Sequence, residues 1–266
     1  MKELTDFELE LISCAYEKEK LGWSFERDAG NFDCFSVNTF LGKRIFFRPK
    51  DNVTYTWLQN SRGLQIDSKD INQLVEAANN CVMSAADVER MDELRDISLP
   101  DKTFIELGFR QPVIMKHMMK RYRSCMGFDI NKMNVLIAHK MGYDAQYINL
   151  GEAVPDLKRL KAGVVVAYHV FEHVVDPITS IIALIDNADD GTYFHLEVPI
   201  ENDCPSLRYS HMFGFYEGDL AKILLKAGCE ILSVKETSNI DRVLARKYAP
   251  IQDKYEKDFD NWFRRI

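Results

Sequence analysis

The sequence predicts an α/β protein whose main domain is a doubly wound, mostly parallel sheet of the seven-stranded type with helices on both faces. From Thr103 onward, short apolar runs of strand length alternate with helical stretches. The chain has 266 residues and is 46% hydrophobic, enough for one large core and an added module. We therefore expect an α/β domain over residues 101–266 and an N-terminal α+β module over residues 1–100.

The N-terminal module is expected to contain helices at both ends and strands between them. Apolar spacing predicts the first helix, and a hairpin is expected to turn at Gly42. Ser68 is placed to cap the second helix, which runs on past Val75. The first helix and three candidate strands cover residues 4–20, 32–40, 44–47 and 53–58.

In the α/β domain the expected elements alternate regularly. Strands are expected at residues 103–107, 124–128, 145–148, 164–168, 193–198, 229–235 and 242–248, the last two as a hairpin. Helices are expected at 113–122, 133–141, 177–187 and 218–227. Ligands of such sheets bind at the carboxyl ends of the strands, where the strand order reverses. The residues that follow each strand are therefore the candidates for a site.

Composition excludes several classes of protein. The net charge of -7 argues against a surface that tracks nucleic-acid phosphates. No apolar run approaches the roughly 20 residues of a membrane span. The first ten residues carry four acidic side chains and do not resemble a signal peptide. Six cysteines without a Cys-x-x-Cys pair fit a cytoplasmic protein with reduced thiols.

Two strand ends carry residues suited to a nucleotide. Gly108 allows a tight turn after the first strand, and Pro112 suits the first position of the next helix. An ordinary strand-to-helix turn would use the same residues. Asp129 ends the second strand about 20 residues later, where an acidic side chain can accept hydrogen bonds from ribose hydroxyls. Asp129 could equally cap the next helix.

The end of the fourth strand is the most specific feature. The apolar run 164–168 leads directly into His169, Glu172 and His173. A lone histidine in this place would more often be structural. Two histidines and a glutamate at the carboxyl end of a sheet favour a functional site.

This stretch resembles the "EHvxDP" signature of class I S-adenosylmethionine-dependent methyltransferases that act on small molecules, lipids and sugars. Further matches follow in the family's order: Asp190-Gly191 before the strand that ends in Val198-Pro199, then His211, then residues 213–216 and 220–228. The resemblance covers about half the chain. It implies a Rossmann-like fold, S-adenosylmethionine as cofactor and a methyl-transfer reaction.

The chain departs from this family in its first loop, which is usually glycine-rich. Glu106 and Gly108 match the pattern, but Arg110 and Pro112 stand where later glycines are expected. Side chains there should push the backbone away from the methionine part of the cofactor. Arg110 could pair with the methionine carboxylate through its planar fork, or point to solvent.

Carried over by position, the resemblance implies a role for each candidate residue. Gly108 passes close to the cofactor and Asp129 holds its ribose. Against the adenine lie Ile130, Asn149 and Leu150, while His169 lines the methionine and sulfonium region. Glu106 and Arg110 complete the predicted cofactor set.

The predicted catalytic residues are Glu172, His173 and His211. Methyl transfer is an in-line displacement with a neutral leaving group, so aligning the nucleophile is the main task. A base helps when the nucleophile is a hydroxyl, and His173 and His211 are the candidates. A loop contact is the equal alternative for His211. We expect no metal, because the sequence alone shows no cluster of three ligands.

The leading hypothesis is an O- or N-methyltransferase for a small molecule, sugar or glycan precursor, with the N-terminal module covering the site. The corresponding turn, 198–201, lacks the tetrad of amino-methylating DNA enzymes, and no Pro-Cys pair is present. A non-catalytic binding or assembly protein is the alternative that the altered loop favours. A dinucleotide enzyme is the third, although the Gly-x-Gly-x-x-Gly fingerprint is absent. An oligomer is compatible with all three.

Overall fold

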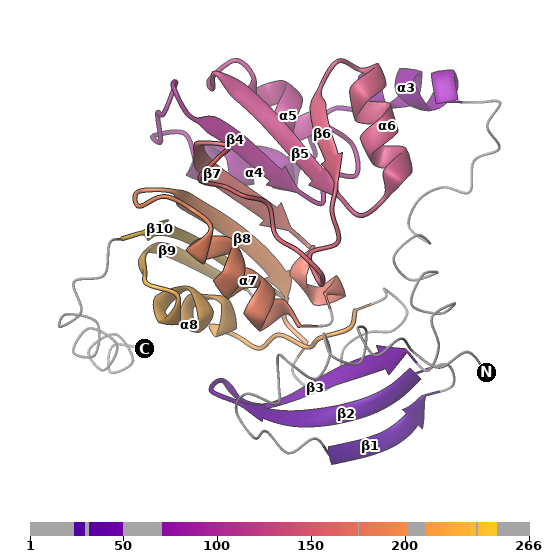
Figure 1. Ribbon diagram of the computed structural model, residues 1–266, viewed down its shortest axis with the longest axis vertical. Coiled ribbons are helices and arrows are strands. Elements are labelled where there is room, and N and C mark those ends of the chain that lie inside the picture. The colour runs from indigo at the N-terminus through magenta and orange to yellow at the C-terminus, as the bar shows by residue number, and fades with distance from the viewer. Residues whose placement is uncertain are drawn as a thin grey trace.

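A computed structural model describes residues 24–29, 32–49, 71–174, 176–201, 211–237 and 239–248. Two sheets are present among them, a seven-stranded sheet and a three-stranded sheet (Figure 1). The helix expected at 4–20, the strand expected at 53–58 and the cap expected at Ser68 lie outside the described residues.

The larger sheet has the predicted doubly wound architecture. Its strands are β4 (Thr103–Leu107), β5 (Ser124–Asp129), β6 (Asp144–Tyr147), β7 (Ala162–Tyr168), β8 (Tyr193–Pro199), β9 (Cys229–Thr237) and β10 (Ile240–Lys247). They lie in the order β6-β5-β4-β7-β8-β10-β9. All neighbours pair in parallel except β10, which is antiparallel to both β8 and β9. The strand order therefore reverses between β4 and β7.

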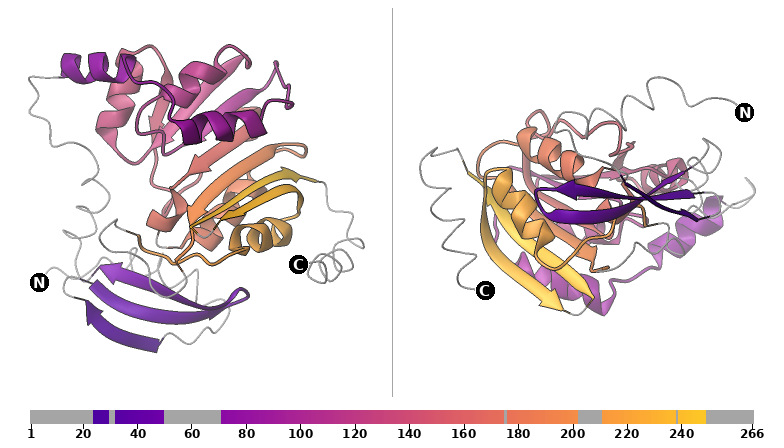
Figure 2. Two further views of the ribbon diagram at one scale, coloured as in Figure 1. Left: turned by 180° about the vertical axis from the view of Figure 1, so that it is seen from behind. Right: turned by 90° about the horizontal axis from the view of Figure 1, so that it is seen from below.

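Helices cover both faces of this sheet, as predicted. On one face lie α4 (Ala85–Glu93), α5 (Val113–Met118) and α6 (Lys132–Lys140); on the other lie α7 (Pro177–Asp186) and α8 (Asp219–Lys226) (Figures 1 and 2). Successive residues of β7 alternate between the two cores: Val164 and Val166 pack toward α4 and α5, while Val165 and Ala167 pack toward α7. Within the described ranges, no helix is both long and apolar enough to cross a membrane.

The three-stranded sheet contains the predicted hairpin. β2 (Phe32–Thr39) and β3 (Gly42–Pro49) pair antiparallel, and Gly42 has a φ of 95° at the turn. A further strand that the sequence pattern did not predict, β1 (Ser24–Ala29), pairs with β2. The hairpin expectation is thus confirmed, and the small sheet gains one strand.

The segment 211–215 links the two sheets through its backbone. On one side Phe213 bridges Phe46 of β3, and the Phe47 N–H donates to the carbonyl of Met212 at 2.9 Å. On the other side Phe215 bridges Ile200, just beyond β8. The small sheet is therefore attached to the larger one by strand-like pairing.

A buried ion pair reinforces this attachment. The guanidinium of Arg44 on β3 donates to both carboxylate oxygens of Asp219, at 2.8 and 2.5 Å. Asp219 is fully buried at the start of α8. Charged side chains are buried at tolerable cost only when they are paired in this way.

Two helices, which lie in the sequence between the small sheet and the large sheet, pack on the α/β domain. α3 (Ile71–Asn79) contacts α6, and α4 lies against the face formed by β4, β7 and β10. Ser84 and Asp87 form a reciprocal capping box that fixes where α4 begins. The domain boundary expected near residue 100 stays a prediction; the structure adds that α4 is packed as part of the larger core.

α4 is held to the sheet by a buried carboxylate. Glu197 on β8 accepts hydrogen bonds from Arg90 of α4 and from Arg242 of β10, whose Nε lies 2.5 Å from Oε2. Arg242 also binds Glu93 of α4 at 2.5 Å. Glu93 lies 2.9 Å from the buried ring of His195. This group of charges, the Glu197 network, joins three elements that the sequence places far apart.

We predict that Glu197→Gln lowers the free energy of unfolding by about 3–5 kcal/mol, because two buried guanidinium groups lose their shared charge. Urea unfolding of the purified variant measures this. Glu230→Gln is the matched control, since Glu230 pairs with Arg246 on the exposed surface. That control should cost less than about 1 kcal/mol. Equal losses in the two variants would contradict the assignment.

The same variant carries a pH prediction. Burial raises the pKa of Glu197, but His169, Arg90 and Arg242 outweigh it and hold that pKa well below its usual range. A carboxylate with a lowered pKa contributes stability that is present above the unfolded value of about 4.3 and is lost as pH falls through the folded value. The stability difference between wild type and Glu197→Gln should therefore shrink below about pH 4. A difference that stays constant from pH 7 to pH 3 would contradict it.

Candidate functional site

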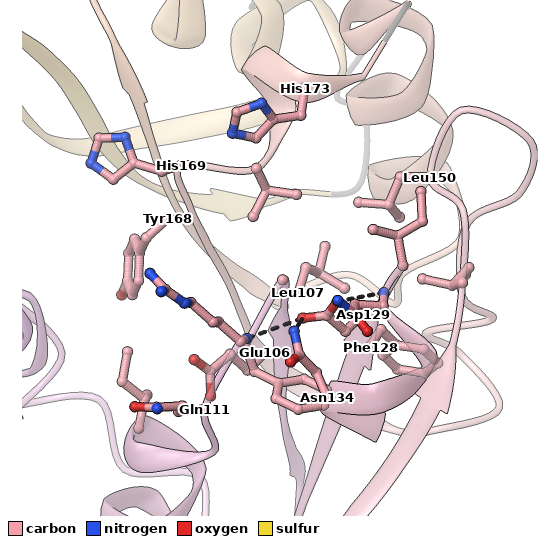
Figure 3. A pocket seen from close by; sticks show the side chains of 18 of the residues that line it. Glu106, Leu107, Gln111, Phe128, Asp129, Asn134, Leu150, Tyr168, His169 and His173 are labelled. Atoms are coloured by element: carbon pink, nitrogen blue, oxygen red, sulfur yellow. Dashed lines mark hydrogen bonds between the residues drawn. The ribbon is translucent and has the colours of Figure 1, made fainter. Parts of the chain in front are cut away.

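A cavity of about 550 Å³ opens at the carboxyl ends of β4, β5 and β7. This is the place where the strand order reverses, so the loops after β4 and β7 leave the sheet in different directions. Figure 3 shows the side chains that line it, with Asp129 on one side and His169 on the other. All the residues predicted to bind the cofactor line this cavity: Glu106, Gly108, Arg110, Asp129, Ile130, Asn149, Leu150 and His169.

The turn after β4 depends on glycine at its first position. Gly108 has a φ of 68°, and a Cβ built there would lie 2.5 Å from Cγ2 of Val170. Its N–H donates to the carbonyl of Phe128 at 2.7 Å. Arg110 also has a positive φ, 41°, although it is not glycine. The loop thus keeps a left-handed backbone at a position where the family that the sequence resembles has glycine. Interactions in the surrounding structure offset the strain.

Asp129 fastens this turn to the end of β5. Its carboxylate accepts hydrogen bonds from the backbone N–H of Arg110 at 3.0 Å and of Asn131 at 2.7 Å. The amide of Asn134 donates to it at 3.2 Å. The alternative that Asp129 caps the next helix is not what the structure shows, because Asn131 caps α6 instead. Burial raises the pKa of Asp129, and these donors oppose the rise.

Glu106 and the loop after β6 form further walls of the cavity. Glu106 accepts the N–H of Met115 at 3.2 Å, and burial raises its pKa well above the usual range. The amide of Asn149 is held by Glu152 at 2.7 Å and by the N–H of Gly151 at 3.1 Å. Asn149 is therefore preorganised, and Leu150 beside it supplies apolar surface.

The backbone reverses sharply after β7. His169 has a φ of 56°, and its N–H donates to the carbonyl of Glu197 at 3.0 Å. Its ring lies between two carboxylates: Nε2 is 2.9 Å from Glu197 and Nδ1 is 3.4 Å from Glu172. Glu172 and Glu197 raise the pKa of His169 to about 9. Since 43% of this side chain is exposed, a positive charge faces the cavity at neutral pH.

The three predicted catalytic residues lie together at the edge of the cavity. His173 lines it, whereas Glu172 and His211 contact His173 and do not line the cavity. The rings of His173 and His211 are 5.0 Å apart, and the carbonyl of Glu172 accepts the N–H of Met212 at 2.6 Å. A loop contact for His211 is therefore also present, through Glu201 at 2.8 Å.

Sequence reasoning missed the wall contributed by α4. Ser84, Asp87 and Arg90 line the cavity, and the guanidinium of Arg90 lies 4.6 Å from the ring centre of Tyr168. The capping pattern Ser84-x-x-Asp87 marks the start of this helix and was available from the sequence. Nothing in the sequence places that helix over β7, since Arg90 and Asp87 read as a solvated face.

The comparisons with known proteins support the fold. No protein-family model matches the chain, and no curated protein matches it. Solved structures do match, among them three with TM-scores of 0.50 or above.

The chain resembles the [4+2]-cyclase SpnF at 13% identity and TM-score 0.52, over 62% of this chain and 82% of that one. It also resembles a protein of Bacillus halodurans whose methyltransferase name is provisional. The identity is 12% and the TM-score is 0.50, over 62% of this chain and 100% of that one. A third match is a chain from the complex between the Haloferax volcanii Trm112 methyltransferase activator and a provisionally named methyltransferase. The identity is 10% and the TM-score is 0.50, over 68% of this chain and 97% of that one. At these identities the likeness establishes the Rossmann-like fold shared with methyltransferases, and the fold alone.

We predict that Gly108→Ala destabilises the protein by more than its backbone cost. A left-handed alanine costs about 1–2 kcal/mol, and the clash with Val170 should add about 1–3 kcal/mol. Gly142→Ala is the matched control, because Gly142 has a φ of 82° and nothing within 4 Å of its Cβ position. Urea unfolding compares the two.

The double variant Gly108→Ala/Val170→Ala separates the causes. Removal of the Val170 methyl groups should cancel the clash and leave the backbone cost, so the double variant should lose less free energy of unfolding than the sum of the two single-variant losses. Losses that simply add would show that the contact with Val170 does not matter.

Proposed function

We propose that this protein binds S-adenosylmethionine in the cavity and methylates an oxygen or nitrogen of a small molecule, sugar or glycan precursor. The observation that carries the proposal is the placement of Asp129, a buried carboxylate at the cavity wall on the strand beside the Gly108 turn. A carboxylate in this position of a doubly wound sheet can accept a hydrogen bond from a ribose hydroxyl, here beside the three donors that Asp129 already binds. A volume of about 550 Å³ is in the usual range for a site of this kind.

The residues fit such a ligand in order around the cavity. Gly108 lines the cavity with a φ of 68°, and the absence of a side chain there avoids a clash with Val170. Ile130 and Leu150 offer apolar surface for a base, and the ordered amide of Asn149 lies beside them. These contacts support the assignments made by resemblance, which remain proposals.

Bound S-adenosylmethionine would supply a methyl group on a positively charged sulfonium. The chain's part in the reaction is then to align an acceptor and exclude water. His173 faces the cavity and can accept a proton from a hydroxyl acceptor, with Glu172 beneath it at 3.6 Å. His211 lies behind His173 and orients it through ring contact.

The small sheet supports the acceptor side of this site. Met212 lines the cavity, and its carbonyl accepts the Phe47 N–H of β3. We propose that the N-terminal module thereby shapes the wall against which the acceptor binds. Its role as a cover remains a prediction.

A non-catalytic binding protein is the second candidate. The observation that favours it is Arg110, whose side chain stands at the cavity where the resembling family has glycine. The name of SpnF, a [4+2]-cyclase, also indicates that this fold hosts more than one function. A folded protein that binds neither S-adenosylmethionine nor S-adenosylhomocysteine would favour this candidate, and stabilisation by NAD alone would favour a dinucleotide enzyme.

We predict that Asp129→Ala weakens binding of S-adenosylhomocysteine by about 1.5–3 kcal/mol, because hydrogen bonds to a charged group are lost. Isothermal titration calorimetry measures the change. Asp144→Ala is the control, since Asp144 is exposed at the opposite end of its strand from the cavity. Thermal unfolding confirms that both variants are folded. Unchanged affinity in folded Asp129→Ala would refute the ribose assignment.

We predict that Arg110→Ala weakens the binding of S-adenosylhomocysteine but leaves the binding of adenosine unchanged. Only the former carries the methionine carboxylate that the Arg110 fork could bind, at about 1.5–3 kcal/mol. Competition calorimetry with both ligands gives the two affinities. If both ligands weaken equally, Arg110 acts through the loop backbone; if neither does, its side chain points to solvent.

A further inference from the structure

Glu172, His173 and His211 bring three potential metal ligands to one point, with one ligand atom from each lying within 4.8 Å of the others. Two imidazoles and a carboxylate form a donor set that binds divalent first-row transition cations. The sequence separates His211 from the other two by a whole strand and helix, which is why the cluster is invisible there. The expectation of no metal therefore rested on a premise that the described residues do not bear out.

Glu172 gives an independent reason to expect a cation. Its side chain is 1% exposed, and neither carboxylate oxygen receives a hydrogen bond. The nearest histidine nitrogens are Nδ1 of His169 at 3.4 Å and Nε2 of His173 at 3.6 Å, and both face the same oxygen, Oε1. A buried carboxylate without hydrogen bonds is costly unless a positive charge lies against it. Since both histidine nitrogens face Oε1, Oε2 is the oxygen left to bind a divalent ion.

His211 is oriented as a metal ligand usually is. Its Nδ1 lies 2.8 Å from a carboxylate oxygen of Glu201. Metal-binding histidines commonly donate one ring N–H to a carboxylate, which fixes the tautomer and turns the other nitrogen to the ion. With Nδ1 held by Glu201, Nε2 is the nitrogen that would bind.

The backbone holds the cluster in place. The N–H of Met212, next to His211, donates to the carbonyl of Glu172 at 2.6 Å. Segment 211–215 is in turn paired with β3, so His211 cannot move far from Glu172. Three ligands on one ion with bonds of about 2.1 Å lie about 3.0–3.6 Å apart, so binding requires the side chains to move closer by about 1–2 Å.

We infer that Glu172, His173 and His211 bind a divalent transition-metal ion at the edge of the cavity. Three protein ligands leave coordination positions open for water or another oxygen. In the proposed methyl transfer, on which this part of the inference rests, the ion would bind the acceptor's hydroxyl oxygen and orient it. The acceptor class is then an alcohol, and His173 would act as a ligand in place of a base.

Titration of the full-length, untagged, chelator-treated protein with Co²⁺ tests the site directly. Binding is followed by calorimetry and by the visible absorption of the histidine-bound ion, with no other ligand present. We expect one ion per chain. Glu172→Gln and His211→Gln should each weaken binding about tenfold or more, and Glu201→Gln should weaken it by about 10–100-fold through His211.

His117→Ala is the matched control, because His117 is an exposed histidine of α5 outside the cavity, and it should bind Co²⁺ as the wild type does. Thermal unfolding establishes that each variant is folded. Equal Co²⁺ affinity in wild type, Glu172→Gln and His211→Gln would overturn the inference, as would no binding by the folded wild type. Binding of S-adenosylhomocysteine is measured separately. If S-adenosylhomocysteine does not bind while Co²⁺ does, the proposed function is wrong and the metal site stands.

Discussion

The arrangement of the α/β domain depends on one buried charge, the carboxylate of Glu197. A fully buried carboxylate must be paired, and here Arg90 of α4 and Arg242 of β10 both pair with it. The pairing draws α4 across the sheet and fixes the antiparallel β10 beside β8. The same carboxylate also binds Nε2 of His169. One charge therefore sets a helix, a strand and the first residue beyond β7, and with them one side of the cavity.

The cavity itself follows from backbone geometry at the strand ends. Gly108, Arg110 and His169 all have positive φ, and all three line the space where the strand order reverses. Left-handed backbone at Arg110 and His169 costs free energy that hydrogen bonds to Asp129 and Glu197 offset. The strain is held at Arg110 by the buried carboxylate of Asp129 and at His169 by the backbone carbonyl of Glu197, which gives preorganised loops at the cavity.

The sequence alone predicted the parallel core well. The apolar run of β7 and the spacing from Gly108 to Asp129 are local patterns, so they need no knowledge of distant contacts. α4 was missed because its charged residues, such as Arg90, find their partners on β8, 107 positions along the chain. The meeting of His211 with Glu172 was likewise beyond local reasoning, because it depends on the pairing of segment 211–215 with β3.

The attachment of segment 211–215 to β3 divides the cavity between two parts of the chain. The walls around Gly108, Asp129 and His169 come from the large sheet and its loops, while the wall at Met212 is held by the small sheet. Substitutions in β3 can therefore reshape one wall without disturbing the other. The two parts of the cavity wall can therefore vary in shape independently of each other, because each is fixed by a different sheet.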